Sequence, residues 1–202
     1  MITIVNYGMG NVGSLLNMFK RVGVKSCVTA DPEVILRAVK LVLPGVGAFD
    51  AAMERINSLP GLRTALDVKA LKEKVPVLGV CLGMQLLTRS SEEGSLSGLG
   101  WIPSVTTRFP KQDGLKVPHM GWNVALPNTS SPLTAQVGLE PRYYFVHSYC
   151  VHVDDPSDSL MRTRYGVNFD SAIGRDNIYG VQFHPEKSHR FGMHILKNFS
   201  DL

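Results

Sequence analysis

The sequence predicts an α/β fold, with a mostly parallel, twisted sheet flanked by helices and an antiparallel extension in the second half of the chain. Short apolar runs rich in Val and Ile occur at residues 2–6, 40–43 and 75–80, and such runs are typical of buried strands. Amphipathic segments of helical length follow or separate them, at residues 15–22, 32–38 and 64–74. Strands that alternate with helices favour right-handed crossovers, which produce a parallel sheet.

The second half of the chain has a different pattern, which predicts the antiparallel extension. Strand candidates at residues 101–107, 142–146, 160–165 and 178–182 are separated by clusters of Gly, Pro, Asn and Asp rather than by helices. A last amphipathic helix is expected over residues 188–199. No internal repeat or long linker divides the chain, so we expect one domain over residues 1–202.

Composition excludes several classes of protein. The chain has 202 residues, 44% of them apolar and 19% charged, with a formal net charge of +4 and no run of basic residues, so we expect neither a nucleic-acid nor a membrane partner. It shows no signal-peptide pattern and no apolar stretch of about 20 residues, which predicts a cytoplasmic protein. Cys27, Cys81 and Cys150 show no CxxC spacing and the histidines are scattered, so we expect no disulfide framework and no metal site.

The most specific local feature is an apolar strand that runs into residues 79–85, GVCLGMQ. Glycines two before and two after Cys81 permit a tight strand-to-helix turn that presents the nucleophile at a helix N-terminus. There the backbone N–H groups favour a thiolate, and the N–H of Leu82 can face an oxyanion. The alternative is a buried cysteine between two packing glycines.

A base for such a thiolate is available near the end of the chain. The strand candidate at residues 178–182 leads to His184, after which Pro185 cannot continue a ladder. Catalytic groups of parallel sheets lie at strand ends, and Glu186, two residues on, can turn back to orient the imidazole. The alternative is a surface turn with a solvated Glu–Lys pair.

A third segment, residues 43–49 (LPGVGAF), is a strand that ends in a glycine-containing turn. Backbone N–H groups at Val46 and Gly47 could complete an oxyanion hole opposite Leu82. Taken alone, this segment is better explained as a plain turn.

Together these three segments resemble the class I, triad-type glutamine amidotransferases, whose fold is flavodoxin-like, and they occur in the same order. Further segments narrow the resemblance to the glutaminase subunits of imidazole glycerol phosphate synthase, and it covers essentially the whole chain. They are residues 7–11 (YGMGN), 116–123 (KVPHMGWN), 144–149 (YFVHSY) and 186–188 (EKS).

The resemblance implies a role for particular residues. Cys81 would be the nucleophile, His184 the general acid and base, and Glu186 its orienting group. An oxyanion hole would involve Val46, Gly47 and Leu82, and the glutamine site would be lined by Gly47, Gln85, Glu93, Ser148 and Tyr149.

The resemblance also implies a partner, a (β/α)₈ cyclase subunit that forms a heterodimer with the glutaminase. Ammonia would pass into that barrel for the synthesis of imidazole glycerol phosphate and aminoimidazole carboxamide ribotide in histidine biosynthesis, with no cofactor. The residues expected at the partner interface or ammonia gate are Asn11, His119, Met120, Trp122, Asn123, Tyr144 and Lys187.

Two alternatives stay open at this point. Thr88 and Arg89 depart from the aromatic and acidic residues expected there, and residues 188–192 (SHRFG) resemble a branch whose cyclase-like partner makes amidino groups on bacterial surface sugars. A different class, an NAD-binding oxidoreductase, would use Gly8, Gly10 and Gly13 with Asp31 as a dinucleotide fingerprint. The fingerprint accounts for only the first part of the chain.

Overall fold

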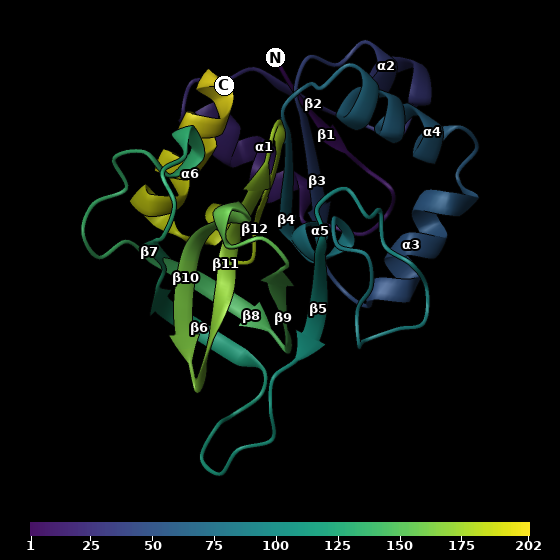
Figure 1. Ribbon diagram of the computed structural model, residues 1–202. Coiled ribbons are helices and arrows are strands. Elements are labelled where there is room, and N and C mark those ends of the chain that lie inside the picture. The colour runs from purple at the N-terminus through teal and green to yellow at the C-terminus, as the bar shows by residue number, and fades with distance from the viewer.

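Five parallel strands form the centre of the computed structural model, which describes residues 1–202 (Figure 1). All positions of the three strands that the apolar runs predicted are buried, and their side chains supply the apolar surface that holds helices on both faces. The half-buried edge strand, rich in polar residues, was not predicted. In spatial order the strands are β2 (Ser26–Thr29), β1 (Ile2–Val5), β3 (Leu41–Gly45), β4 (Val77–Cys81) and β12 (Ile178–Val181).

The predicted antiparallel extension continues this sheet beyond β12. Strand β11 (Val167–Arg175) pairs antiparallel with both β12 and β10 (Ser159–Tyr165). The short β7 (Leu126–Pro127) closes the edge beside β10. A branch forms where β9 (Tyr149–Val153) pairs with both β11 and β5 (Ser104–Arg108).

One predicted strand lies outside this sheet. Strand β8 (Arg142–His147) was expected in the main sheet, but it pairs with β6 (His119–Val124) in a separate two-stranded sheet, so that prediction was wrong. Its side chains alternate between buried and more exposed. Tyr143 and Phe145 therefore pack into the core from one side, and packing replaces the hydrogen bonds that would have joined β8 to the main sheet.

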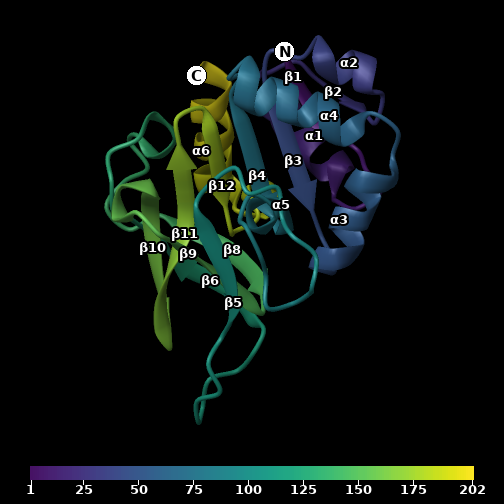
Figure 2. The same ribbon diagram turned by 45° about the vertical axis from the view of Figure 1, so that its right-hand side comes forward.

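Helices cover both faces of the parallel strands, and Figures 1 and 2 show α6 opposite the group α2, α3 and α4. One face carries α1 (Val12–Arg21) and α6 (His189–Asp201), with Phe19 and Phe199 in one apolar cluster. The other face carries the remaining helices over a second cluster. These are α2 (Pro32–Leu36), α3 (Phe49–Ser58), α4 (Leu62–Asp67), which continues as the π-helix η1 (Val68–Lys72), and α5 (Leu82–Leu86).

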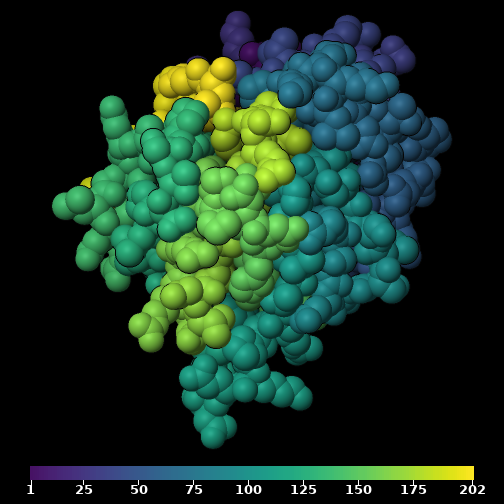
Figure 3. Space-filling model, viewed as in Figure 1, coloured from purple at the N-terminus to yellow at the C-terminus, as the bar shows by residue number.

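The predicted helices at residues 15–22, 32–38, 64–74 and 188–199 are confirmed with shifted ends, whereas α3 was not predicted. Three 3₁₀ turns complete the chain: η2 (Pro132–Thr134), η3 (Pro156–Asp158) and η4 (Pro185–Lys187). The segment between β5 and β6 projects from the body of the molecule (Figure 3). None of the helices combines the length and apolar character needed to cross a membrane.

The carboxyl ends of β3, β4 and β12 meet at one edge of the sheet. Gly45 pairs with Cys81, and Val181 pairs with Val80, so the segments that follow these strands emerge side by side. Active sites of open parallel sheets lie at this edge.

Candidate active site

Cys81 occupies a strained turn between β4 and α5. Its backbone has φ 55° and ψ −112°, and a positive φ is uncommon for a residue other than glycine. A side chain at Gly83 would overlap the Leu43 carbonyl oxygen, so the glycine is needed where α5 starts against β3. The strand-to-helix turn predicted from the sequence is therefore present, with Cys81 at its apex and 7% exposed.

His184 and Glu186 form a buried pair beside this turn. Nδ1 of His184 lies 2.9 Å from Oε1 of Glu186, and the two side chains are 4% and 2% exposed. The turn at Pro185 begins η4 directly after His184, which brings the carboxylate back beneath the imidazole.

The imidazole of His184 also interacts with Cys81. Its Nε2 atom has no hydrogen bond within normal geometric limits. Burial lowers the pKa of His184, but the polar contacts with Cys81 and Glu186 raise it by more, so the net pKa shift is upward. A protonated imidazole between a sulfur and a carboxylate can hold a thiolate and later donate a proton.

A cavity of about 390 Å³ opens at Cys81 and His184. All the predicted oxyanion and substrate residues line it, whereas Glu186 lies behind His184. The sequence did not point to Pro118, Val146 or His147, which also line it. The predicted residues at its wall are Val46, Gly47, Leu82, Gln85, Glu93, Ser148 and Tyr149, together with Lys187 from the predicted partner set.

Gln182 is a neighbour of the thiol that sequence reasoning missed. Its Nε2 lies 3.8 Å from Sγ of Cys81, and its Oε1 accepts a hydrogen bond of 3.0 Å from Gln85. The sequence position of Gln182 could have pointed to it. Gln182 is two residues before His184, and alternate residues of an extended chain lie on the same side.

The carboxylate of Glu93 is fixed at the cavity by α3 and its preceding loop. Oε2 accepts a hydrogen bond from the backbone N–H of Phe49 at 3.0 Å. Burial raises the pKa of Glu93, the Phe49 N–H lowers it, and the Asp50 charge raises it, with a net upward pKa shift. Asp50 itself accepts hydrogen bonds from the N–H groups of Ser95 and Leu96, which ties down the loop that carries Glu93.

A hydrogen bond from Tyr7 fixes the end of β3, just before the turn that follows this strand. The hydroxyl of Tyr7 donates a hydrogen bond of 2.6 Å to the carbonyl oxygen of Pro44. A side chain at Gly45 would lie 2.7 Å from the backbone nitrogen of Gly83, and Gly47 has φ 100°. The predicted oxyanion residues Val46 and Gly47 thus follow a fixed peptide and border the cavity that contains Cys81.

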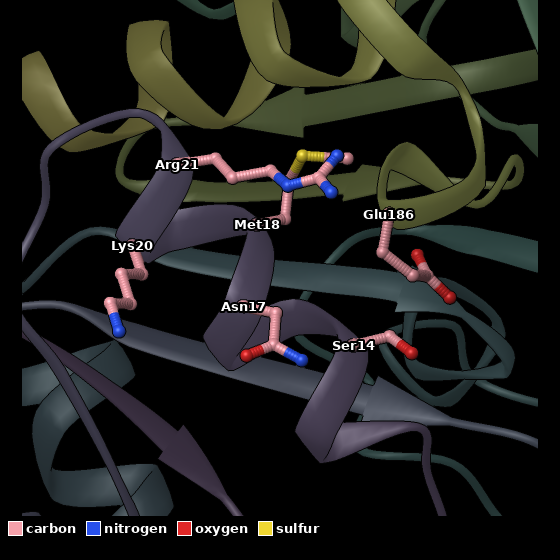
Figure 4. A pocket seen from close by; sticks show the side chains of 6 residues that line it. All are labelled: Ser14, Asn17, Met18, Lys20, Arg21 and Glu186. Carbon is pink, nitrogen blue, oxygen red and sulfur yellow. The ribbon is translucent and has the colours of Figure 1, made fainter.

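Glu186 also borders a second cavity, of about 600 Å³, on the side of α1 (Figure 4). Figure 4 shows Glu186 among the residues that line this cavity, with Ser14, Asn17 and Arg21 of that helix. Oε2 of Glu186 is buried without a hydrogen-bond partner.

The residues predicted to face a partner divide into two groups. Met120 and Trp122 are 62% and 45% exposed on β6, and Nζ of Lys187 lies 5.7 Å from the centre of the Tyr144 ring. His119, in contrast, is 2% exposed. Adjacent residues of a strand point to opposite faces, and His119 lies on the inner face.

Two further predicted partner residues hold local structure. The exposed Asn11 caps α1, because its Oδ1 accepts a hydrogen bond of 3.4 Å from the N–H of Ser14. Asn123 is half-buried, and its Nδ2 donates to the carbonyl oxygen of Arg164 at 3.1 Å.

Of the three glycines of the dinucleotide fingerprint, Gly10 packs against β3, whereas Gly8 and Gly13 have open space around them. A side chain at Gly10 would meet the Pro44 ring at 3.0 Å. Asp31, the candidate ribose-binding acid, caps α2 by accepting a hydrogen bond from the N–H of Glu33 at 2.9 Å. Gly10 and Asp31 therefore have structural roles, in packing against Pro44 of β3 and in beginning α2.

Comparison with known proteins gives relatives along the whole chain. The family model described as "Glutamine amidotransferase class-I" matches residues 3–201. The imidazole glycerol phosphate synthase subunit HisH 2 of Methanococcus maripaludis is 51% identical over 199 residues, covering 98% of each chain. The subunit of the same name from Pseudomonas aeruginosa is 48% identical over 202 residues, covering 100% of each chain.

Solved structures agree in fold at low sequence identity. PurLQS of Thermotoga maritima superposes with a TM-score of 0.76 at 14% identity, covering 99% of this chain and 97% of the other. A glutamine amidotransferase of the same organism superposes with a TM-score of 0.62 at 16% identity, covering 99% and 82%. With the family model and the close relatives, these comparisons establish that the chain belongs to the class I glutamine amidotransferase family.

Proposed function

We propose that this chain is the glutaminase subunit of an imidazole glycerol phosphate synthase. It hydrolyses glutamine to glutamate and ammonia and supplies the ammonia to a cyclase subunit for histidine biosynthesis. The observation that carries the proposal is the buried triad: Cys81 and His184 share one cavity, and Glu186 holds His184 at 2.9 Å. The names of the relatives at 51% and 48% identity support the assignment of the subunit.

In the first half-reaction the thiolate of Cys81 attacks the side-chain amide carbon of glutamine. His184 donates its proton to the amide nitrogen, the carbon–nitrogen bond breaks, and ammonia leaves a γ-glutamyl thioester on the sulfur. The oxyanion formed on the way is assigned to the N–H of Leu82 and to the turn at Val46 and Gly47. Donors fixed in advance stabilise such a charge without reorganising during the reaction.

In the second half-reaction His184 acts as a base. It accepts a proton from water as the oxygen attacks the thioester carbon, the carbon–sulfur bond breaks, and glutamate leaves. The carboxylate of Glu186 accepts the hydrogen bond from the protonated Nδ1 of His184. Nε2 of His184 is therefore the nitrogen that exchanges protons with the reacting atoms.

The substrate would be oriented by polar groups in the cavity wall. Glu93, with one oxygen on the Phe49 N–H, retains its other oxygen for the α-ammonium group. Gln85 and the Ser148–Tyr149 backbone are assigned to the remaining polar atoms of the substrate.

Ammonia transfer requires a closed route to the partner, because free ammonia is mostly protonated at neutral pH and is then not nucleophilic. Met120 and Trp122 are exposed apolar groups, and Lys187, which lines the cavity, lies over the ring of Tyr144. This supports a heterodimer that covers the mouth with a (β/α)₈ cyclase. The proposal includes one amidotransferase domain over residues 1–202 and a cytoplasmic location, where phosphorylated metabolites are retained by their charge.

The proposal is tested with Cys81→Ala in the complex with the cyclase subunit. We expect glutamine-dependent synthesis to fall by at least about 100-fold, because the nucleophile is lost, while synthesis from added ammonium salts is unchanged. Cys27→Ala, at a half-buried cysteine on the edge strand, is the control and should change neither. Loss of both activities in a folded complex would show that Cys81 is structural.

A second candidate has the same glutaminase chemistry with another acceptor, a surface sugar that receives an amidino group. One observation favours it: the segment at residues 188–192, which resembles that branch. In the structure His189 of this segment stacks on Trp122 with ring centres 5.5 Å apart, so it belongs to the proposed partner face. Stimulation of glutamine hydrolysis by the ribonucleotide precursor of imidazole glycerol phosphate would exclude this second candidate.

A further inference from the structure

Two buried histidines outside the triad lie side by side in the two-stranded sheet, and one of them, His147, also lines the cavity. His119 on β6 and His147 at the end of β8 are 2% and 6% exposed. Nδ1 of His119 lies 2.9 Å from Nε2 of His147. Their other ring nitrogens are also hydrogen-bonded, to Asn123 and to the Tyr149 carbonyl, and neither pairs with a carboxylate.

The partners at the two ends fix the direction of every hydrogen bond. Nδ1 of His147 lies 2.7 Å from the carbonyl oxygen of Tyr149, which can only accept, so this nitrogen carries the proton. Nε2 of a neutral His147 then accepts, and Nδ1 of His119 must donate to it. Nε2 of His119 in turn accepts from the Asn123 amide at 3.2 Å.

The orientation of the Asn123 amide agrees with this direction. Its oxygen accepts a hydrogen bond from the N–H of Val124 at 2.8 Å, and its nitrogen donates to the carbonyl oxygen of Arg164 at 3.1 Å. The nitrogen is therefore the atom that faces His119, and it can only donate.

The inner end of the chain of hydrogen bonds reaches the thiol. The Tyr149 carbonyl that accepts from His147 also accepts from Nε2 of Gln85, at 3.4 Å. Gln85 donates to Gln182 at 3.0 Å, and Gln182 lies 3.8 Å from Sγ of Cys81. The outer end, Asn123, lies on the strand that carries the exposed Met120 and Trp122.

We propose that His119 and His147 are positioning residues that form a directional relay of neutral imidazoles. The relay holds the Tyr149 carbonyl, and through it the amides of Gln85 and Gln182, in one orientation beside Cys81. This inference rests on the proposed function, because the geometry that the relay fixes is that of the glutamine cavity.

The surroundings of the pair favour neutral rings. Burial lowers the pKa of His119 to about 4. Burial also lowers the pKa of His147, its hydrogen bond to Tyr149 raises it, and the nearby His119 and His184 lower it again, to about 3. His119 is stacked between Phe145 and Tyr165, with ring centres 4.7 and 4.0 Å away, so little space is left for a water that could solvate a cation.

The direction of the relay is tested by NMR on the chain with ¹⁵N-labelled histidine. We expect both rings to be Nδ1–H tautomers that do not titrate between pH 5.5 and 8, although free neutral histidine prefers Nε2–H. Asn123→Asp puts an acceptor where the donor was, so His119 should gain a proton on Nε2 in that variant. Nε2–H tautomers in the wild type, or a titration midpoint near 6.5, would overturn the relay.

Positioning is tested by glutamine kinetics of the complex with His119→Phe. Phenylalanine keeps the stacked ring but leaves Nε2 of His147 buried and unpaired, so we expect KM to rise roughly tenfold with kcat within about twofold. Tyr165→Phe is the matched control: it keeps the stacking on His119 and loses only the hydroxyl that donates to the carbonyl oxygen of Lys116 at 2.7 Å. It should leave both constants unchanged.

Equal losses of kcat and melting temperature in the two variants would mean that His119 only fills space, and the proposal would be wrong. A wild-type complex that hydrolyses no glutamine would reject the proposed function instead. The tautomer spectra would still decide whether the relay exists, so the two failures are distinguishable.

Discussion

Glu186→Gln removes the negative charge behind His184 while keeping its shape. The glutamine oxygen can still accept from Nδ1 of His184, which lies 2.9 Å from the carboxylate in the native chain. A hydrogen bond to a charged group contributes about 1.5–3 kcal/mol and a neutral one about 0.5–1.5 kcal/mol. The expected loss is therefore about 1–2 kcal/mol, which corresponds to a roughly 5- to 30-fold lower kcat.

The same substitution should change the pH dependence. The carboxylate is one of the groups that raise the pKa of His184, so the neutral amide lowers that pKa. The protonated imidazole is then lost at a lower pH, and the alkaline limb of the kcat profile should move down by about one pH unit, since about 1.4 kcal/mol corresponds to one unit.

The assay is glutamine turnover by the complex between pH 6 and 10, with ammonium-dependent synthesis as the test of an intact partner. Glu54→Gln, at an exposed position of α3, is the matched control and should be unchanged. His184→Asn should lose far more, about 100- to 10,000-fold, because general acid–base catalysis itself is removed. An unshifted profile for Glu186→Gln with turnover within twofold of wild type would refute the orienting role of Glu186.

Three further predictions follow from the packing. Asp50→Asn weakens the clamp on the loop that carries Glu93, so KM for glutamine should rise about threefold to tenfold with little change in kcat; an unchanged KM would contradict the clamp. His119 and His147 stay neutral in the fold, whereas the unfolded chain binds protons below about pH 6.5, so stability should fall as pH decreases from 6.5 towards 4. At pH 5 the loss is about 2 kcal/mol for each histidine, measured by urea unfolding, and a flat profile would be inconsistent with buried neutral rings. Gly83→Ala places a methyl group against a backbone carbonyl of β3, so it should yield insoluble protein or a stability loss of about 3 kcal/mol or more, and a wild-type melting temperature would contradict this close approach.

The sequence predicted the parts of the fold that depend on local apolar pattern. Strands β1, β3 and β4 are continuous apolar runs and were expected close to their observed limits. Strand β11 was missed because Asn168, Asp170 and Gly174 interrupt the pattern. Its polar positions are accommodated by pairing: Asp170 accepts hydrogen bonds from Ser159 and from the Val153 N–H, and neither partner is adjacent in sequence.

The same division holds for the site. The turn around Cys81 and the His184–Glu186 pair are encoded within a few residues, so their geometry could be expected from spacing. The contacts of Gln182 with Cys81 and of Tyr7 with Pro44 join residues 101 and 37 positions apart, which no local pattern reveals. The burial of His119 could not be predicted for a related reason, because its neighbours Pro118 and Met120 are exposed and only the strand register shows that His119 faces inward.

The separate β6–β8 ribbon has a consequence for how such a subunit can change its partner. Met120 and Trp122 project from one side of β6, and His119 and Asn123 from the other. Because the ribbon is hydrogen-bonded within itself and not to the parallel strands, its outer residues can be exchanged without altering a ladder of the main sheet. Under the roles proposed above, recognition of a new synthase and maintenance of the hydrolytic cavity fall on alternate positions of one strand, so substitutions can alter the first while leaving the second intact.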